Sequence, residues 1–243
     1  MRALRRLALL LALSPAALAA AEPARPLLPG IFGADDRVPF EPDAWPWTAI
    51  GRVNREVGGF CTGTLVGKRQ VLTAAHCLRH PRTGAPLPPH TVHFVAGYRR
   101  GEYGVHARAV SFVTGQGPGP AADWAVVTLE RDAGIRPLKV RALSVEQAAA
   151  ARGRGGLVRA GYSQDRAHLP TRASGCGLTG AVPGLLLHDC DATRGDSGSA
   201  LLDGEGEGMA VVGLHIGTTL KDGGPRNLAV SAEAFAGAVA GGR

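Results

Sequence analysis

The chain has 243 residues, of which 45% are hydrophobic, 19% charged and 5% aromatic. This balance excludes a disordered chain and indicates one large or two small hydrophobic cores. The formal net charge of +7 is scattered along the sequence, which excludes the clustered basic face with stacking aromatic residues that nucleic-acid binding needs.

The N-terminus has the three-part pattern of a secretory signal peptide, which we place at residues 1–21. Three Arg residues begin it, an apolar run covers residues 7–13, and small residues follow. The apolar run is too short to span a membrane, and no later segment is long enough to do so. Removal of the peptide takes away three Arg and no acid, so the net charge falls from +7 to +4. We therefore expect a secreted or periplasmic protein with no membrane span.

Short strand-like segments dominate the rest of the chain. Residues 22–30 are rich in Pro and predict an extended tail or a short propeptide. The predicted strands cover residues 47–53, 60–66, 70–73, 91–96, 105–113, 124–129, 156–161, 185–190, 199–202 and 209–215. Regular short strands with Gly-rich turns are typical of an all-β sandwich or barrel.

Helical patterns are confined to two places in the sequence. Residues 145–152 follow Ser144, a good N-cap residue, and residues 231–240 lie near the C-terminus. The strands divide into two halves, residues 31–135 and 136–243, and each half has the size of a small barrel. The join falls within residues 131–142, around Pro137.

Three segments each place one polar side chain beside an apolar strand, at a strand end or a turn. The segments are Thr-Ala-Ala-His-Cys at residues 73–77, Asp-Trp-Ala at 123–125 and Gly-Asp-Ser-Gly at 195–198. A Ser hydroxyl needs an adjacent base to become a good nucleophile, and the base needs a third group that fixes its tautomer. His has a pKa near the working pH, and a buried carboxylate can orient its ring. His76, Asp123 and Ser197 are therefore the candidate catalytic residues.

A nucleophilic Ser also needs preorganised N–H donors for the oxyanion that develops on the substrate. Gly195 stands two residues before Ser197 and leaves room for its backbone N–H to point at the substrate. The N–H groups of Gly195 and Ser197 are therefore the candidate oxyanion hole.

The three segments, in this order, resemble those of the trypsin-like (chymotrypsin-fold) serine peptidases, and the resemblance runs from about Ile31 to the C-terminal helix. It implies two six-stranded antiparallel β-barrels with the active site between them and a short C-terminal helix. It also implies that His76 is the general base, Asp123 its orienting partner and Ser197 the nucleophile that forms an acyl-enzyme. No metal or cofactor is expected, and the partner is a protein or peptide substrate of a monomeric enzyme.

Some features are more similar to the bacterial branch of this family, which includes glutamyl endopeptidases. They are Ser199 after Gly-Asp-Ser-Gly, the segment at residues 32–37 and Trp-Pro-Trp at residues 45–47. Ser199 also breaks the G-x-S-x-G pattern of α/β-hydrolases, which disfavours an esterase. A binding protein on the same fold, with little turnover, is the other alternative.

The four Cys residues, at positions 61, 77, 176 and 190, indicate disulfides in an exported chain. Four Cys allow three pairings, and we expect the local one, Cys61–Cys77 with Cys176–Cys190. Each bond would close a loop of about 15 residues and stabilise the fold by about 3 kcal/mol. A metal cluster is disfavoured because the sequence has no C-x₂-C pair.

The resemblance also implies residues for the pocket that receives the side chain before the cut. They are Asp191, Ala192, Arg194, His215, Gly217 and Thr218. Asp191 at the pocket base would favour Arg or Lys by charge pairing. His215 stands where glutamyl endopeptidases place a His that receives an acidic side chain. We expect cleavage after a basic residue, with an acidic residue as the alternative.

Arg194 is expected at the pocket mouth, Thr218 in the pocket wall, and Gly217 in backbone pairing with the substrate. The segment Gly30-Ile31-Phe32-Gly33 is similar to the new N-terminus of activated animal relatives, whose freed ammonium pairs with the Asp before the nucleophile. That Asp is Asp196 here. The alternative that Ile31 simply begins the first strand stays open.

Overall fold

The computed structural model describes residues 28–151, 153–221 and 224–240. The expected signal peptide and most of the expected N-terminal tail lie outside the described residues. Within the described part of the chain, no helix is long and apolar enough to cross a membrane.

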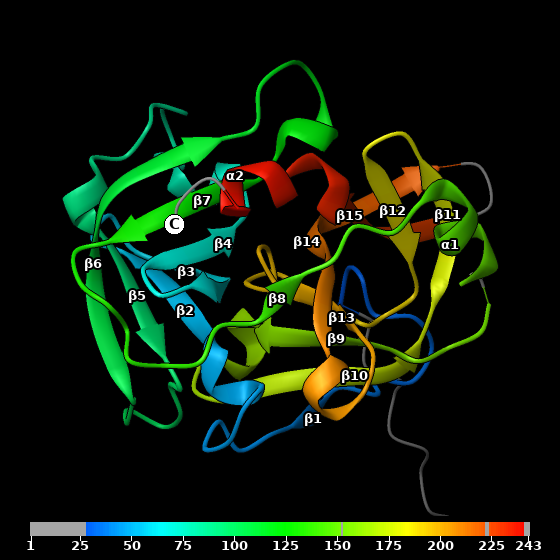
Figure 1. Ribbon diagram of the computed structural model, residues 1–243, viewed down its shortest axis with the longest axis horizontal. Coiled ribbons are helices and arrows are strands. Elements are labelled where there is room, and N and C mark those ends of the chain that lie inside the picture. Colours follow the sequence, from blue (N-terminus) through cyan, green and yellow to red (C-terminus); the bar gives the residue numbers. More distant parts are fainter. Residues whose placement is uncertain (1–27, 152, 222–223, 241–243) are drawn as a thin grey trace, which may run out of the picture.

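Six antiparallel strands close into a barrel in the order β2-β3-β4-β7-β6-β5 (Figure 1). The strands are β2 Ile50–Arg55, β3 Phe60–Gly67, β4 Gln70–Thr73, β5 Val92–Ala96, β6 Val105–Thr114 and β7 Ala125–Leu129. Leu65, Leu72 and Leu129 are fully buried inside this barrel, and each such side chain stabilises the fold by about 1.5–3 kcal/mol. β3 is buried from Phe60 to Val66 because its outer face also packs toward the second half of the molecule.

The second half is a curled nine-stranded sheet in the order β1-β10-β9-β13-β14-β15-β12-β11, with β8 paired to β14 in parallel. The strands are β1 Val38–Pro39, β8 Lys139–Val140, β9 Leu157–Tyr162, β10 Pro170–Cys176, β11 Leu178–Val182, β12 Leu185–His188, β13 Ala200–Asp203, β14 Ala210–Lys221 and β15 Gly224–Ser231. The all-β prediction with two barrel-like halves is confirmed. The second sheet differs in detail, because its pairing runs from β1 to β11 and does not close.

Two short α-helices lie within the segments that the sequence predicts to be helical. The second begins five residues later than predicted, because Ser231 ends β15 and Ala232–Ala234 form a 3₁₀ turn. In α1, Val145–Ala150, the Ser144 hydroxyl accepts the Gln147 N–H, and the Gln147 side chain accepts the Ser144 N–H. This reciprocal capping satisfies two otherwise unpaired donors and fixes the start of the helix. α2, Ala236–Ala240, lies near the C-terminus beside the first barrel (Figure 1).

Single 3₁₀ turns join several strands of both sheets. They are Trp47–Ala49, Ala75–Leu78, Pro89–Thr91, Pro120–Ala122, Gln164–Arg166, Gly206–Gly208 and Ala232–Ala234. The division at residue 135 stays a prediction. The barrel strands fall within residues 50–129, whereas Val38 and Pro39 pair with β10 of the second sheet.

Candidate active site

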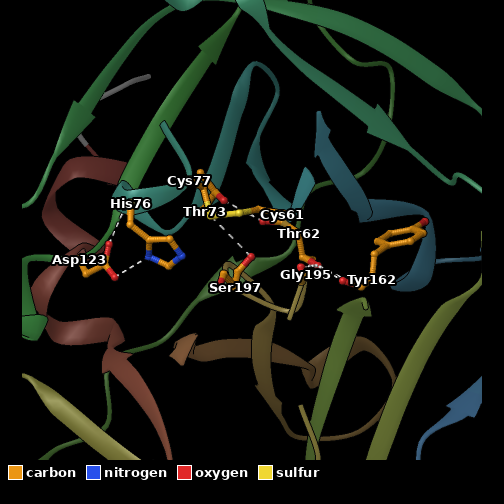
Figure 2. The surroundings of a disulfide bond; sticks show 9 residues. All are labelled: Cys61, Thr62, Thr73, His76, Cys77, Asp123, Tyr162, Gly195 and Ser197. Carbon is orange, nitrogen blue, oxygen red and sulfur yellow. Dashed lines mark hydrogen bonds and ion pairs between the residues drawn. A yellow bond between two sulfur atoms is a disulfide. The ribbon is translucent and has the colours of Figure 1, made fainter. Parts of the chain in front are cut away.

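His76 and Asp123 lie at the same end of the first barrel. His76 is in the 3₁₀ turn after β4, and Asp123 lies two residues before the strand β7 that pairs with β4. His76 Nδ1 is 2.7 Å from Asp123 Oδ2, and the His76 N–H donates to Asp123 Oδ1 at 2.8 Å (Figure 2). These two contacts fix the ring and leave Nε2 as its free nitrogen.

Ser197 lies on the side of the imidazole that faces away from Asp123 (Figure 2). Its carbonyl accepts the Thr62 N–H at 2.9 Å, and the next N–H, of Gly198, donates to His215 O at 2.7 Å. Gly198 has φ of +87°, and a Cβ there would lie 2.1 Å from Thr62 O, so only Gly fits. No hydrogen bond joins the Ser197 hydroxyl to His76 among the described residues, and the two groups are brought together without being bonded.

The candidate oxyanion hole has the required free donors. Among the described residues, neither the Gly195 nor the Ser197 N–H donates to a backbone acceptor. Gly195 has φ of +96°, and a Cβ there would lie 2.8 Å from Tyr162 O. Glycine is therefore needed both for the backbone conformation and for the close approach of β9.

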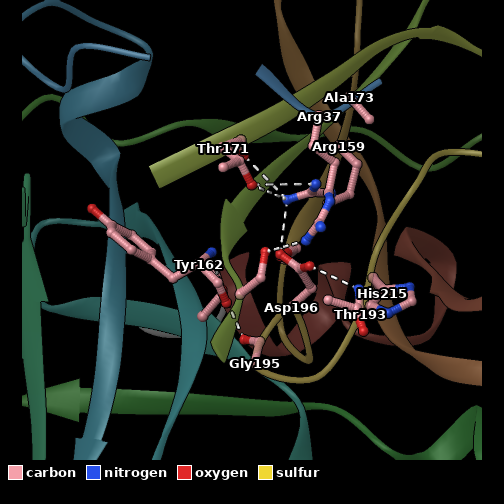
Figure 3. A network of polar contacts seen from close by, with 12 residues as sticks. Arg37, Arg159, Tyr162, Thr171, Ala173, Thr193, Gly195, Asp196 and His215 are labelled. Atoms are coloured by element: carbon pink, nitrogen blue, oxygen red, sulfur yellow. Dashed lines mark hydrogen bonds and ion pairs between the residues drawn. The ribbon is translucent and has the colours of Figure 1, made fainter. Parts of the chain in front are cut away.

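Asp196, between these two residues, is held by a buried ion pair. Its Oδ1 is 2.8 Å from Arg159 Nη1, and both side chains are 0% exposed (Figure 3). Its Oδ2 accepts the Thr193 N–H at 2.9 Å. The partner of Asp196 in this structure is thus a guanidinium from β9, rather than the freed N-terminal ammonium that the resemblance offers as one alternative. Ile31 is buried in a loop rather than in a strand.

Asp191 is 2% exposed and does not have a free carboxylate. Its Oδ1 accepts the Phe32 N–H at 2.8 Å, and its Oδ2 accepts the Asp36 N–H at 3.1 Å. Burial, and then the charge of Asp191, raises the pKa of Asp36. The neighbouring Ala192 is buried, and its N–H donates to Gly30 O. The N-terminal segment thus packs directly against these two pocket candidates.

His215 lies on β14 and is buried against a second imidazole. Its Nδ1 is 3.2 Å from Nε2 of His188 on β12. Burial, together with the charges of His188 and Arg159, lowers the pKa of His215 well below its usual value, and burial lowers that of His188 to about 3. Both imidazoles are therefore neutral at neutral pH.

The remaining pocket candidates are Arg194, Gly217 and Thr218. Arg194 is exposed, and its carbonyl accepts the Gln164 N–H at 2.7 Å. Its guanidinium forms no ion pair with any described residue. The Thr218 hydroxyl donates to Asn227 Oδ1 at 2.7 Å, and Gly217 pairs with β15.

Both disulfides have the expected local pairing, Cys61–Cys77 and Cys176–Cys190. They close loops with sequence separations of 16 and 14 residues. The first attaches β3 to the turn that carries His76 (Figure 2).

Sequence reasoning missed four buried residues that support the site, namely Thr62, Arg159, His188 and Asn227. Asn227 donates to both Gly30 O and Cys190 O. Only Arg159 carried a usable signal, since it is a charged residue within a predicted apolar strand.

The fold and the sequence are similar to those of known proteins. A solved structure described as a Glu endopeptidase in complex with MPD superimposes with a TM-score of 0.72 at 21% sequence identity, over 87% of this chain and 97% of that one. That likeness shows a shared fold. No curated protein sequence matches the chain. The family model for trypsin matches residues 36–236. Because this match covers most of the sequence, the chain belongs to the trypsin family of serine peptidases, which hydrolyse peptide bonds.

Proposed function

We propose that the protein is an endopeptidase that forms an acyl-enzyme on Ser197. The arrangement that supports the proposal has two parts. The imidazole of His76, oriented by Asp123, lies beside Ser197, and the N–H groups of Gly195 and Ser197 have no backbone acceptor among the described residues. His76 Nε2 takes the Ser197 proton as Oγ bonds to the substrate carbonyl carbon. The Gly195 and Ser197 N–H groups stabilise the oxyanion.

The same imidazole then returns the proton to the leaving amine as the C–N bond breaks. Water adds to the acyl-enzyme by the reverse sequence, and the acid product leaves Ser197 free. A binding protein with little turnover would not need these groups. Ser199 breaks the G-x-S-x-G pattern of α/β-hydrolases, which disfavours an esterase of that class.

A fluorophosphonate probe tests this assignment, because it phosphonylates only an activated Ser. We expect labelling of the wild-type protein and of Ser111→Ala, a matched change at an exposed Ser, and none of Ser197→Ala. Labelling that persists in Ser197→Ala, or that is absent from the folded wild-type protein, would contradict the proposal.

For specificity we propose an acidic side chain before the cut, in place of the basic one that the sequence favours. Asp191 is the basis of the basic preference, and both its oxygens already accept N–H groups from the N-terminal segment. Arg194 offers an exposed guanidinium three residues before Ser197, without an ion-pair partner among the described residues. The neutral imidazole of His215, on β14, can donate a hydrogen bond to a carboxylate.

The structural likeness to a protein described as a Glu endopeptidase points the same way. Export fits the two disulfides and the N-terminal sequence pattern. We also propose that the protein is a monomer and has no nucleic-acid partner.

Peptide substrates that differ only in the residue before the cut test the specificity. We expect kcat/KM for Glu to exceed that for Lys, and Arg194→Ser to lower only the Glu value, by about tenfold, because a charge-assisted contact is lost. Arg154→Ser, at another exposed Arg, is the control. If kcat/KM is higher for Lys than for Glu, and Asp191→Asn abolishes this difference, the preference is basic and the proposal of an acidic side chain is wrong.

A further inference from the structure

Thr62 lies in β3 at the boundary between the two halves and is 0% exposed. Its backbone binds both halves. The N–H donates to Ser197 O at 2.9 Å, and the carbonyl accepts the Thr73 hydroxyl at 2.7 Å (Figure 2). A strand of the first barrel therefore contacts the nucleophile loop of the second sheet directly.

The Thr62 hydroxyl makes a second set of contacts on the same side. It accepts the Tyr162 N–H at 2.8 Å. It has one proton to donate, and Gly195 O, at 3.1 Å, is closer than Tyr162 O, at 3.4 Å. The hydroxyl thus connects β9 with the first residue of the oxyanion-hole segment.

Gly195 needs such an external restraint. Its φ of +96° lies in a region that only glycine visits readily, and glycine is the residue with the most backbone freedom. The Thr62 N–H holds the carbonyl of Ser197 and the Thr62 hydroxyl holds that of Gly195, so both ends of the segment that carries the two N–H donors are fixed by one residue.

We propose that the Thr62 hydroxyl is a positioning group that keeps the Gly195 and Ser197 N–H groups aimed at the oxyanion. The inference rests on the proposed function, since it concerns the same oxyanion hole. It predicts that loss of this hydroxyl weakens transition-state binding while ground-state binding of substrate is preserved.

The same strand supplies a matched control. Thr64 is also fully buried, but its hydroxyl has no hydrogen-bond partner among the described residues. Thr62→Val and Thr64→Val therefore make the same chemical change two residues apart, and only the first removes contacts to the active-site loop. Thr62→Ser restores the hydroxyl.

We expect Thr62→Val to lower kcat by about ten- to a hundredfold with KM nearly unchanged, because small displacements of oxyanion donors are costly. Thr62→Ser should recover kcat to within about threefold because Ser has the same donor and acceptor groups. Thr64→Val should stay within about twofold of wild type since it loses no hydrogen bond.

A peptide aldehyde gives an independent readout. Its carbonyl carbon bonds to Ser197 Oγ, and the resulting oxyanion occupies the hole. Thr62→Val should weaken aldehyde binding by the same factor as kcat/KM, while binding of the cleaved peptide product is unchanged.

The outcomes separate this inference from the proposed function. If wild type is not labelled by a fluorophosphonate, the proposed function fails. If wild type is labelled and Thr62→Val matches Thr64→Val in kcat and in aldehyde binding, the Thr62 inference alone is wrong. Should Thr62→Val not fold, Thr62→Ala, which leaves space in place of the hydroxyl, is compared with Thr62→Ser in the same assays. Equal kcat in that pair would also overturn it.

Discussion

At the scale of single residues, an unusual feature is the pair of neutral imidazoles in the interior, His188 and His215. His188 and His215 bond only to each other among the described side chains, and His188 Nδ1 is buried without a partner. A buried neutral His resists protonation, whereas the same His in the unfolded chain takes up a proton near its ordinary pKa. The pair therefore connects fold stability to pH.

The first prediction concerns this acid sensitivity. The pKa of His188 is about 3 in the fold and 6.5 as the ordinary value, so below pH 6.5 the unfolded chain binds a proton that the folded chain does not. The free energy of unfolding should fall by about 1.4 kcal/mol per pH unit for this His as the pH drops from 6.5 toward 3.

Urea unfolding of wild type and His188→Leu at several pH values measures this effect. The free energy of unfolding of the variant should fall less steeply than that of wild type on acidification. The two slopes should differ by up to about 1.4 kcal/mol per pH unit, the value for one proton. His90→Leu, at an exposed His, should keep the wild-type slope. Parallel curves for wild type and His188→Leu would show that His188 does not titrate in this way.

At the scale of elements, the sequence predicted the bounds of several strands closely. β4 was predicted with its observed bounds, Gln70–Thr73, and β3, β5, β6, β7, β9 and β13 within one residue at each end. β1, β8, β10, β11 and β15 were missed. β1 and β8 are only two residues long, and Pro, Gly or polar residues interrupt the patterns of the other three. Trp47–Ala49 forms a 3₁₀ turn although its residues favour a strand.

The sequence predicted those residues of the candidate site that lie in short sequence motifs. His76, Asp123 and Ser197 each lie in such a motif. The supporting contacts of Thr62, Arg159 and His188 join residues separated by 133, 37 and 27 positions. No local pattern specifies partners at those distances, since only the fold brings them together.

The second prediction concerns Arg159, which lies in β9. Arg159 Nη1 bonds both Asp196 and Thr171 O, and so connects the nucleophile loop to β10. Because the ion pair is fully buried, Arg159→Met leaves an unpaired carboxylate and should lower the free energy of unfolding by about 3–5 kcal/mol. The loop between Gly195 and Ser197 loses an anchor, so kcat should fall as well.

A double variant provides the control for this change. Arg159→Met with Asp196→Asn removes both charges, and it should recover part of the lost stability because no buried charge remains unpaired. Denaturant unfolding and kcat measure the two effects. An Arg159→Met variant as stable as wild type would contradict the assigned role of the pair.

At the scale of the whole molecule, the site is divided between the two halves. His76 and Asp123 come from the closed barrel, and Ser197 comes from the second sheet. The C-terminal segment returns from the second sheet to the first barrel, where Phe235 is fully buried with its ring centroid 6.3 Å from that of Trp124. Trp124 directly follows Asp123, so this contact ties the C-terminus to the base-orienting carboxylate.

The effect of the Phe235–Trp124 contact on Asp123 can be measured separately from its effect on the free energy of unfolding. Phe235→Ala and Phe94→Ala each remove a buried ring, and each should lower the free energy of unfolding by about 3–5 kcal/mol. Phe94 lies within β5, which pairs with β2 and β6 and not with β4 or β7, so its loss should leave kcat at wild-type level under conditions where the variant is fully folded. Phe235→Ala should lower kcat by about tenfold under the same conditions, because Asp123 is then less well positioned. Equal kcat values for the two variants would mean that the C-terminal segment contributes only burial, and that β4 and β7 alone position the His76–Asp123 pair.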